Sequence, residues 1–547
     1  MKDFKLDEKD DSGLTISIVD CADADITLRK QQEDWANWTE SGWDDFDVDV
    51  GVLPVATGKS RCFTMAANWC AQNNLGTVAG LTPTKMLQDQ YDKDFDWIPI
   101  LKGANAYPCQ ANKGYDCART KLVAKNYCKP EDCKCPYRSA VSLAKGSPIA
   151  IFNFHSYYFG ENHRPIVMID EGHNATNFVM GMFGTNLWKF QVNYPNFTEL
   201  SRFGQSSIKL DPKEVLEWLG KYVEELDAEM NAALMRDTIL DIKIAEKLES
   251  KIRNLTFVMY GLRSKPEDIL VLKKNDWYNG HESEFSEYKN TEQEFLYIKP
   301  LKIDKLAAQI LWPKDIVKKI VFLSSTIGEK DIEMLGLQDR KVRYFECDSP
   351  IPPERRPFVY WPVVDMSYKQ RQKSLPDLIK AITKIADNFP DKKGIVHCTY
   401  DVAEKLRRTE AFDDRFMFHG KRDKNDMYYR FRETKEPKIL IASGMSEGID
   451  LAGPDFGFQV ITMVTRPSLA DDVNFWRIKY DKEVYDWETV RTIIQQTGRI
   501  SRGPEDMGVT IMLDKQFKRL FYDTHTRRIE NGKKSMWYDW FLKAIKW

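Results

Sequence analysis

The sequence lacks the features that would place it in a membrane or outside the cell. None of its apolar runs approaches the ~18 residues that a membrane-spanning helix needs. The charged segment 1–13 has no apolar core of the kind found in secretory signals. A fixed short repeat and a low-complexity linker are also absent. We therefore expect a globular protein that works in the cytoplasm and has no membrane partner.

Neither sign of charge is in excess. Lysine and arginine total 80, aspartate and glutamate total 82, and the formal net charge is −2. This balance argues against a protein that coats nucleic acid through a basic surface, but it allows a groove with a local basic lining. At 547 residues the chain is too long for one hydrophobic core, so we expect several domains.

Cysteine is scarce except in one segment, where five of the ten cysteines lie within 27 residues. In a chain without an export signal, such a cluster indicates metal binding rather than disulfide bonding. Four thiolates suit either a [4Fe–4S] cluster or zinc, and the spacing C-x₇-C-x₁₀-C-x₄-C-x-C does not separate the two. The five residues are Cys109, Cys117, Cys128, Cys133 and Cys135.

Short apolar runs rich in β-branched residues alternate with helical patterns at both ends of the chain. This alternation predicts an α/β protein with two parallel sheets. Two segments interrupt it: the cysteine-containing region 101–147, and region 180–311, which we interpret as a mainly helical insertion because apolar residues recur at helical spacing after Asp211. The expected strands are 49–55, 77–83, 148–154, 165–171, 318–325, 394–398, 438–443, 458–464 and 508–514.

The segment 53–60, LPVATGKS, follows the first expected strand and precedes a helical pattern. The backbone N–H groups of such a turn, backed by a helix N-terminus, form an anion site for phosphates. Lys59 would reach the β- and γ-phosphates of ATP, and the Ser60 hydroxyl would hold Mg²⁺. A chance GKS tripeptide is the alternative, since Leu53 replaces the first glycine of the full pattern. The preceding strand favours the phosphate loop.

Two acids end the apolar strand in the segment 166–173, IVMIDEGH. Asp170 can bind Mg²⁺ at the carboxyl end of this strand, and Glu171 can orient and deprotonate an attacking water. The simpler interpretation is a strand that ends in a polar turn. The phosphate loop on the same predicted sheet favours the catalytic pair.

The segment 495–502, QQTGRISR, carries two arginines three residues apart in the second α/β region. Residues at this spacing share one face of a helix or turn. Arg499 and Arg502 could reach the γ-phosphate from a neighbouring domain, and such arginine fingers contribute ~10³–10⁵ in rate. The alternative is a solvated basic helix. The position between two expected strands argues against it.

These three elements, in this order, resemble the motifs of superfamily 2 helicases, and most closely those of the XPD/DinG-like iron–sulfur DNA helicases. The resemblance covers nearly the whole chain. It implies a nucleotide site that includes Gln32, Thr57, Gly58 and Gln495 besides the residues named above, and single-stranded DNA contacts from 81–90. The similar segments are 29–32, 81–90, 170–173, 323–326, 394–400, 446–451 and 495–502.

The resemblance also implies an architecture of two RecA-like P-loop motor domains, the first carrying an iron–sulfur cluster insertion and a helical arch insertion. The first motor domain would comprise 1–100, 148–180 and 312–346, and the second 347–547. The cluster domain would be 101–147 and the arch 181–311. The sequence departs from the family at Ala56, where a glycine is common, and at Gly172, where alanine is usual. The added Cβ of Ala56 matters only if that position needs a positive φ.

For the metal site, the resemblance favours a [4Fe–4S] cluster over zinc. Residues 102–109 are similar to the family segment that leads into the first cluster ligand. Residues 135–137 are similar to the family segment that carries the last cluster ligand. Two cysteines one residue apart rarely both reach a compact cluster without strain, so Cys133 is taken as the spare thiol, although it could exchange roles with Cys117. The expected ligands are Cys109, Cys117, Cys128 and Cys135.

We therefore expect an ATP-dependent DNA helicase that uses ATP, Mg²⁺ and a [4Fe–4S] cluster. The resemblance implies 5′ to 3′ movement on single-stranded DNA and unwinding of tailed duplex DNA by a monomeric motor. No feature of the sequence identifies a protein partner. The alternatives are a translocase that does not unwind, or action on RNA or RNA–DNA hybrids. We expect the aromatic stretch 535–547 to pack on the second motor domain. Candidates for base stacking are Tyr107, Phe154, Tyr157 and Tyr158.

Overall fold

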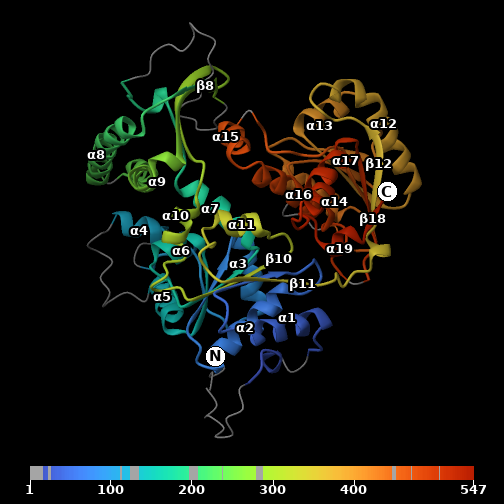
Figure 1. Ribbon diagram of the computed structural model, residues 1–547. Coiled ribbons are helices and arrows are strands. Elements are labelled where there is room, and N and C mark those ends of the chain that lie inside the picture. Colours follow the sequence, from blue (N-terminus) through green and yellow to red (C-terminus); the bar gives the residue numbers. More distant parts are fainter. Residues whose placement is uncertain are drawn as a thin grey trace.

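Two parallel sheets organise the computed structural model, and a third group of elements stands beside the first sheet (Figure 1). All nine strands expected from the sequence form within these two sheets. The α/β class and the two RecA-like domains are therefore confirmed. The structure describes residues 16–22, 26–110, 114–123, 135–195, 207–236, 238–278, 287–445, 451, 453–469, 471–503 and 505–547.

The first sheet has seven strands in the order β11-β1-β10-β5-β2-β4-β3, all parallel. Every residue of β1, β2 and β5 is buried, as expected for a parallel sheet covered on both faces. The strands are β1 (Val48–Val52), β2 (Val78–Thr82), β3 (Ile100–Leu101), β4 (Ile149–Asn153), β5 (Ile166–Asp170), β10 (Lys319–Ser324) and β11 (Val342–Glu346). The helices are α1 (Lys30–Ser41), α2 (Lys59–Gln72), α3 (Lys85–Asp94), α5 (Pro136–Gly146), α6 (Phe154–Phe159), α7 (Ala175–Met182), α10 (Asp304–Ile310) and α11 (Glu329–Met334).

The second sheet also has seven parallel strands, in the order β14-β15-β13-β16-β17-β12-β18. The strands are β12 (Phe358–Val364), β13 (Lys393–Cys398), β14 (Phe416–Phe418), β15 (Ile439–Ser443), β16 (Phe456–Ile461), β17 (Val509–Asp514) and β18 (Ile545–Lys546). The helices are α12 (Arg371–Asn388), α13 (Tyr400–Arg407), α14 (Lys424–Glu433), α15 (Asp472–Tyr480), α16 (Lys482–Thr497), α17 (Gln516–Phe521), α18 (Arg527–Glu530) and α19 (Asp539–Leu542).

The insertion into the first motor domain contains a sheet that the sequence did not predict. Besides the two long helices, four antiparallel strands lie in the order β6-β9-β8-β7. One face of this sheet packs on α9 and the other on Val473 of the second motor domain, so β8 begins as a continuous apolar run without the alternation of a half-exposed strand. The elements of the insertion are β6 (Thr185–Trp188), β7 (Ser207–Lys209), α8 (Pro212–Arg236), α9 (Ile239–Ser264), β8 (Ile269–Trp277) and β9 (Glu292–Pro300). Helix α4 (Cys117–Val123), in the cysteine-containing region, packs against α9.

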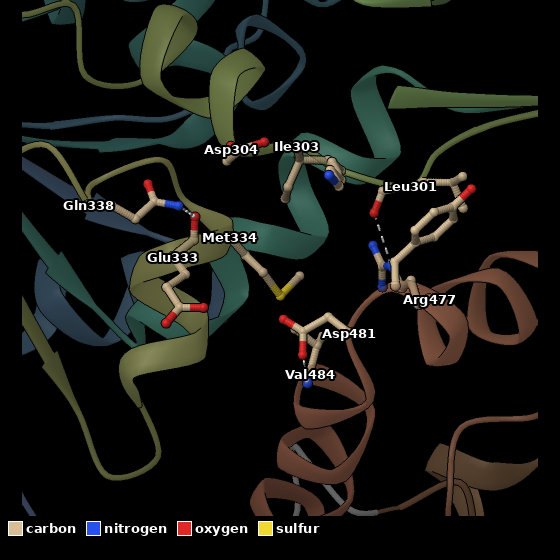
Figure 2. Close-up of a pocket in the computed structure, with 11 residues that line it drawn as sticks. Leu301, Ile303, Asp304, Glu333, Met334, Gln338, Arg477, Asp481 and Val484 are labelled. Carbon is tan, nitrogen blue, oxygen red and sulfur yellow. Dashed lines mark hydrogen bonds between the residues drawn. The ribbon is translucent and has the colours of Figure 1, made fainter. Parts of the chain in front are cut away.

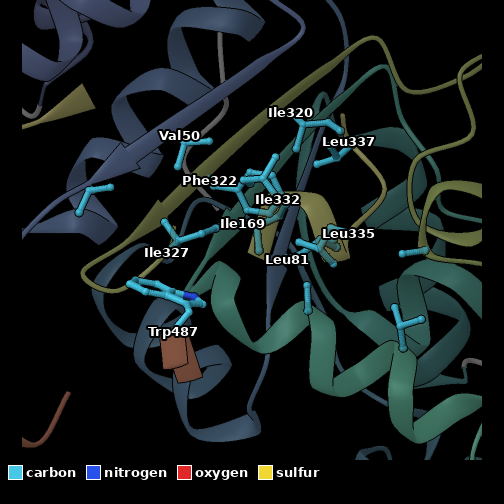
Figure 3. Close-up of a cluster of buried hydrophobic side chains, with 14 of the residues drawn as sticks. Val50, Leu81, Ile169, Ile320, Phe322, Ile327, Ile332, Leu335, Leu337 and Trp487 are labelled. Atoms are coloured by element: carbon cyan, nitrogen blue, oxygen red, sulfur yellow. The ribbon is translucent and has the colours of Figure 1, made fainter. Parts of the chain in front are cut away.

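The two motor domains share a hydrophobic core. Trp487 of α16, in the second domain, lies beside Ile327 of the first, as Figure 3 shows, and shares a buried cluster with Phe322. Side chains of the two domains therefore form one buried cluster, and α16 is fixed against the edge of the first sheet where its strands end.

The aromatic C-terminal stretch packs on the second motor domain, which confirms that expectation. β18 extends the second sheet by pairing with β12, and Trp537 and Phe541 pack against Phe517 and Phe358. The stretch also contacts the first domain, because the Tyr538 hydroxyl donates a 2.9 Å hydrogen bond to a backbone carbonyl of that domain. No helix within the described residues is long and apolar enough to cross a membrane.

Candidate active site

The phosphate loop connects β1 to α2 through a turn with two left-handed residues. Gly58 has φ +84° and directly precedes the first residue of α2, Lys59. Ala56 has φ +72°, so the residue that replaces a glycine here adopts a conformation that costs an L-residue about 1–2 kcal/mol. The guanidinium of Arg29 donates to the Ala56 carbonyl and holds the turn in place.

One polar group of this loop suits a phosphate ligand, and a side chain of α1 packs on the loop. The Thr57 hydroxyl is buried and has no hydrogen-bond partner among the described residues. A buried hydroxyl without a partner is costly, so a ligand oxygen at this position would stabilise it. Gln32 of α1 lies on the loop, accepting from the Arg29 N–H at 2.9 Å and donating to the Gly58 carbonyl at 3.4 Å.

The carboxylate pair lies at the carboxyl end of β5, facing the phosphate loop. Glu171 has φ +53°, and its Oε1 lies 4.0 Å from Lys59 Nζ. Burial and the neighbouring Glu171 charge raise the pKa of Asp170 to about 6. Burial opposes ionisation of Glu171 as well, yet the charge of Lys59 holds its pKa below the usual value. Glu171 is therefore ionised at neutral pH and can accept a proton.

Arg499 and Arg502 follow the C-terminal end of α16 and approach the same carboxylate from the second motor domain. Their charges also lower the pKa of Glu171. The domains meet closely here, since a Cβ added to Gly498 would lie 2.8 Å from Val55 Cγ2 of the phosphate loop. Phosphate loop, carboxylates and arginines, far apart in sequence, thus converge on one place.

Gln495 contacts protein groups of the first motor domain rather than the phosphate loop. Its Nε2 lies 2.9 Å from His173 Nε2 and 3.3 Å from the Thr326 hydroxyl. Burial lowers the pKa of His173 to about 4, so this imidazole is neutral and its Nδ1 lies 3.1 Å from Ser324 Oγ. Gln495 therefore joins the segments 170–173 and 323–326 across the domain interface.

The structure adds residues that the sequence analysis missed. Asp331 of α11 is fully buried between the domains, where it accepts hydrogen bonds from Trp487 Nε1 at 2.8 Å and from the Arg491 guanidinium at 2.6 Å. Trp487, Arg491 and Gln495 are spaced i, i+4 and i+8 on α16 and so share one face. The sequence could have indicated Trp487 and Arg491, because they precede Gln495 by eight and four residues and so lie on the same helix face.

Three of the expected cluster ligands are buried in one small lobe. An antiparallel bridge between Pro108 and Asp116 places the segments that carry Cys109 and Cys117 side by side. Cys135 Sγ lies 3.1 Å from Cys117 Sγ. Buried thiols with this spacing suit soft metal chemistry. Cys128 and Cys133 lie outside the described residues, and among the described ones no three His, Cys, Asp or Glu side chains are gathered as a metal site.

Two of the four proposed stacking residues are part of the protein interior, and Tyr107 and Tyr158 are half-buried. Tyr157 is fully buried and donates to the Leu311 carbonyl at 3.1 Å, and Phe154 is 3% exposed, so neither can stack on a base. Tyr158 packs against aromatic neighbours, and Tyr107 packs on Tyr137. The expectation of base stacking is therefore wrong for Tyr157 and Phe154. The motif at 446–451 lies outside the described residues except for its last position.

A separate cavity of about 320 Å³ lies where the first motor domain, the insertion and the second motor domain meet. Figure 2 shows Met334 and Val484 on opposite walls, and Arg477 donating to the Leu301 carbonyl at 3.4 Å. None of the phosphate-loop residues lines it. The cavity is therefore distinct from the nucleotide site.

Comparisons with known proteins agree with this arrangement. Residues 389–529 match the helicase C-terminal domain family. A solved XPD helicase structure matches with a TM-score of 0.57 at 16% identity, covering 92% of this chain and 99% of that one. The S. tokodaii Xpd4 structure matches with a TM-score of 0.52 at 14% identity, covering 95% of this chain and 99% of that one. The chain therefore has the fold of these XPD structures. The resemblance found in the sequence is thus confirmed at the level of the fold.

Proposed function

We propose that this chain is an ATP-dependent DNA helicase that moves 5′ to 3′ along single-stranded DNA and unwinds tailed duplexes. The observation that carries the proposal is the placement of Glu171 between Lys59 of one motor domain and the arginines of the other. An ionised carboxylate between cations from two domains suits hydrolysis that depends on domain closure.

The roles of the residues follow from their positions. Lys59 would bind the β- and γ-phosphates, and Glu171 would orient water and accept its proton. Arg499 and Arg502 would stabilise the charge that develops on the γ-phosphate. Mg²⁺, held by Ser60 and Asp170, would neutralise charge on the phosphate oxygens. Gln32 would lie near the adenine base by its likeness to the family motif.

The contacts of Gln495 support coupling between hydrolysis and movement. Its amide joins His173, next to the catalytic acid, to Thr326 in the segment after β10. Loss of the γ-phosphate would remove the ligand that the arginines share with the first domain, and the α16 face would then be free to shift. Repeated closure and opening would move one domain along the strand. DNA stacking averages ~1.4 kcal/mol per base-pair step, so opening a few pairs per cycle is a modest demand.

The cysteine lobe supports a metal centre as part of the same proposal. Cys109, Cys117, Cys128 and Cys135 would hold a [4Fe–4S] cluster, which would supply a rigid fold to the lobe beside the arch. The lobe is tied to α9 by Arg119, which makes two hydrogen bonds to Glu246. Serine substitution at each of these cysteines should remove the visible absorbance of the cluster, with Cys133→Ser as the matched control. Iron and zinc analysis of the same samples decides the metal.

Strand displacement by anaerobically purified protein tests the proposal. Duplexes with a 5′ or a 3′ single-stranded tail are compared with and without ATP, and Lys59→Ala serves as the inactive control. Unwinding of only the 5′-tailed duplex supports the helicase and its direction together. Hydrolysis stimulated by DNA without unwinding would indicate a translocase, and activity only on RNA-tailed substrates would indicate an RNA enzyme. Absence of hydrolysis on every substrate would refute the motor itself.

A further inference from the structure

Helix α3 presents two different faces. Its N-cap, Thr84, accepts a hydrogen bond from the Leu87 N–H at 3.2 Å, and the first turn exposes Lys85 and Met86 to solvent. Three residues apart on the opposite face, Gln88 and Tyr91 are buried. The exposed turn belongs to the segment that the family resemblance assigns to single-stranded DNA. A strand bound at this turn would therefore act on the buried residues through the helix that carries both faces.

The buried face of α3 ends at the proposed magnesium site. The Tyr91 hydroxyl donates a 2.9 Å hydrogen bond to Asp170 Oδ2, and its ring packs edge-on against Phe63 of α2. A side chain from α3 therefore contacts Asp170, one of the two residues that the proposed function assigns to Mg²⁺.

The carboxylate of Asp170 is held at both oxygens. Oδ2 accepts from Tyr91, and Oδ1 accepts from the Glu171 N–H at 2.9 Å. One donor on each oxygen fixes the plane of a carboxylate that is only 3% exposed. Phenylalanine would fill the same apolar space as Tyr91, so packing alone does not require the hydroxyl. The effect of the hydroxyl is to orient the carboxylate of Asp170.

We propose that Tyr91 is a positioning residue that orients Asp170 for Mg²⁺ and connects the strand-contacting helix α3 to the metal site. Because a helix moves as a rigid unit, a shift of α3 when a strand binds would move the phenol relative to Asp170. The inference deepens the proposed function and rests on it.

The test compares Tyr91→Phe with Tyr157→Phe. The control removes a fully buried hydroxyl of the same domain, one that donates to the Leu311 backbone carbonyl and lies in the core rather than at the nucleotide site. The measured quantity is the affinity for a fluorescent ADP analogue, titrated with Mg²⁺ and repeated in excess chelator. Loss of a group that orients a metal ligand typically costs 10–100-fold in metal affinity.

We expect Tyr91→Phe to raise the Mg²⁺ concentration needed for tight nucleotide binding by about 10-fold, while its affinity in chelator stays that of the wild type. An unchanged Mg²⁺ titration, or an equal loss of affinity with and without Mg²⁺, would overturn the proposal, since the second result indicates only a structural role. Wild-type protein that binds no nucleotide would instead refute the proposed function.

The connection to α3 is measured separately on the same variants. Tyr91→Phe should reduce the stimulation of ATP hydrolysis by single-stranded DNA at saturating Mg²⁺, with unchanged affinity for the strand, and Tyr157→Phe should retain it. Full stimulation in Tyr91→Phe would overturn the link from α3 to the metal site.

Discussion

Replacing Arg491 with methionine should destabilise the interface between the two motor domains more than any exposed ion pair does. The substitution keeps the length of the side chain but leaves Asp331 without its cation. Asp331 has no exposed surface, and burial raises its pKa even with Arg491 beside it. Breaking one partner of such a buried pair costs about 3–5 kcal/mol.

The loss of unfolding free energy in Arg491→Met has an upper limit that depends on pH. Without Arg491, Asp331 can avoid a buried charge by taking up a proton. Against an ordinary aspartate pKa near 3.9, that costs about 4 kcal/mol at pH 7 and about 1.5 kcal/mol at pH 5. The variant's carboxyl would have a raised pKa in the folded state, so the deficit in stability is largest at high pH and shrinks as the pH falls.

Thermal unfolding at the two pH values measures this effect. For a domain of 150–250 residues, 1 kcal/mol corresponds to roughly 2–4 °C, so Arg491→Met should unfold on the order of 10 °C below wild type at pH 7 and only a few degrees below it at pH 5. Arg408→Met is the control, because Arg408 forms an exposed i,i+4 pair with Glu404, worth about 0–1 kcal/mol. Adding Asp331→Asn should restore part of the loss. A deficit no larger than the control's, or one that does not change with pH, would refute the reasoning.

Three other variants test single features of the fold. Ala56→Gly relieves the left-handed strain at φ +72° but frees the unfolded chain, so thermal unfolding should rise by no more than a few degrees, and a clear loss would contradict the assigned strain. Gly498→Ala places a Cβ 2.8 Å from Val55 Cγ2, and kcat for ATP should fall while nucleotide affinity in chelator is retained. Burial lowers the pKa of His397 to about 4, below its unfolded value near 6.5, so stability present above pH 6.5 should be lost as the pH falls toward 4. The contribution is about 3 kcal/mol, and His397→Gln should flatten that part of the denaturant-measured profile.

Much of the candidate site could be predicted because its residues lie where parallel strands end. Asp170 terminates β5 and the phosphate loop follows β1, and the carboxyl ends of parallel strands share one edge of a sheet. The strands themselves were evident as buried apolar runs. The order of the motifs along the chain supplied the family resemblance, which completed the prediction of the candidate site.

The features that could not be predicted from the sequence depend on packing between distant segments. Nothing local marks Tyr91 as a partner of Asp170, because the contact spans 79 positions and requires α3 to lie against β2 and β4, next to β5 in the sheet. The sheet of the insertion was missed because its outer face is covered by α15, so β8 lacks alternation. The effect of Ala56 depended on a backbone angle that the residue type does not determine.

Two consecutive helices of the second motor domain face two different parts of the chain. α16 contacts the first motor domain through Arg491, whereas α15 contacts the sheet of the insertion, where Tyr297 donates to Asp471 at 3.1 Å and Lys274 pairs with the neighbouring Asp472 (Figure 1). A single residue, Asp481, separates the helices and caps α16 by accepting from its first N–H groups. The contacts of the second motor domain with the insertion and with the first motor domain therefore lie on two helices that meet at one residue, next to the segment that carries the arginines of the proposed nucleotide site.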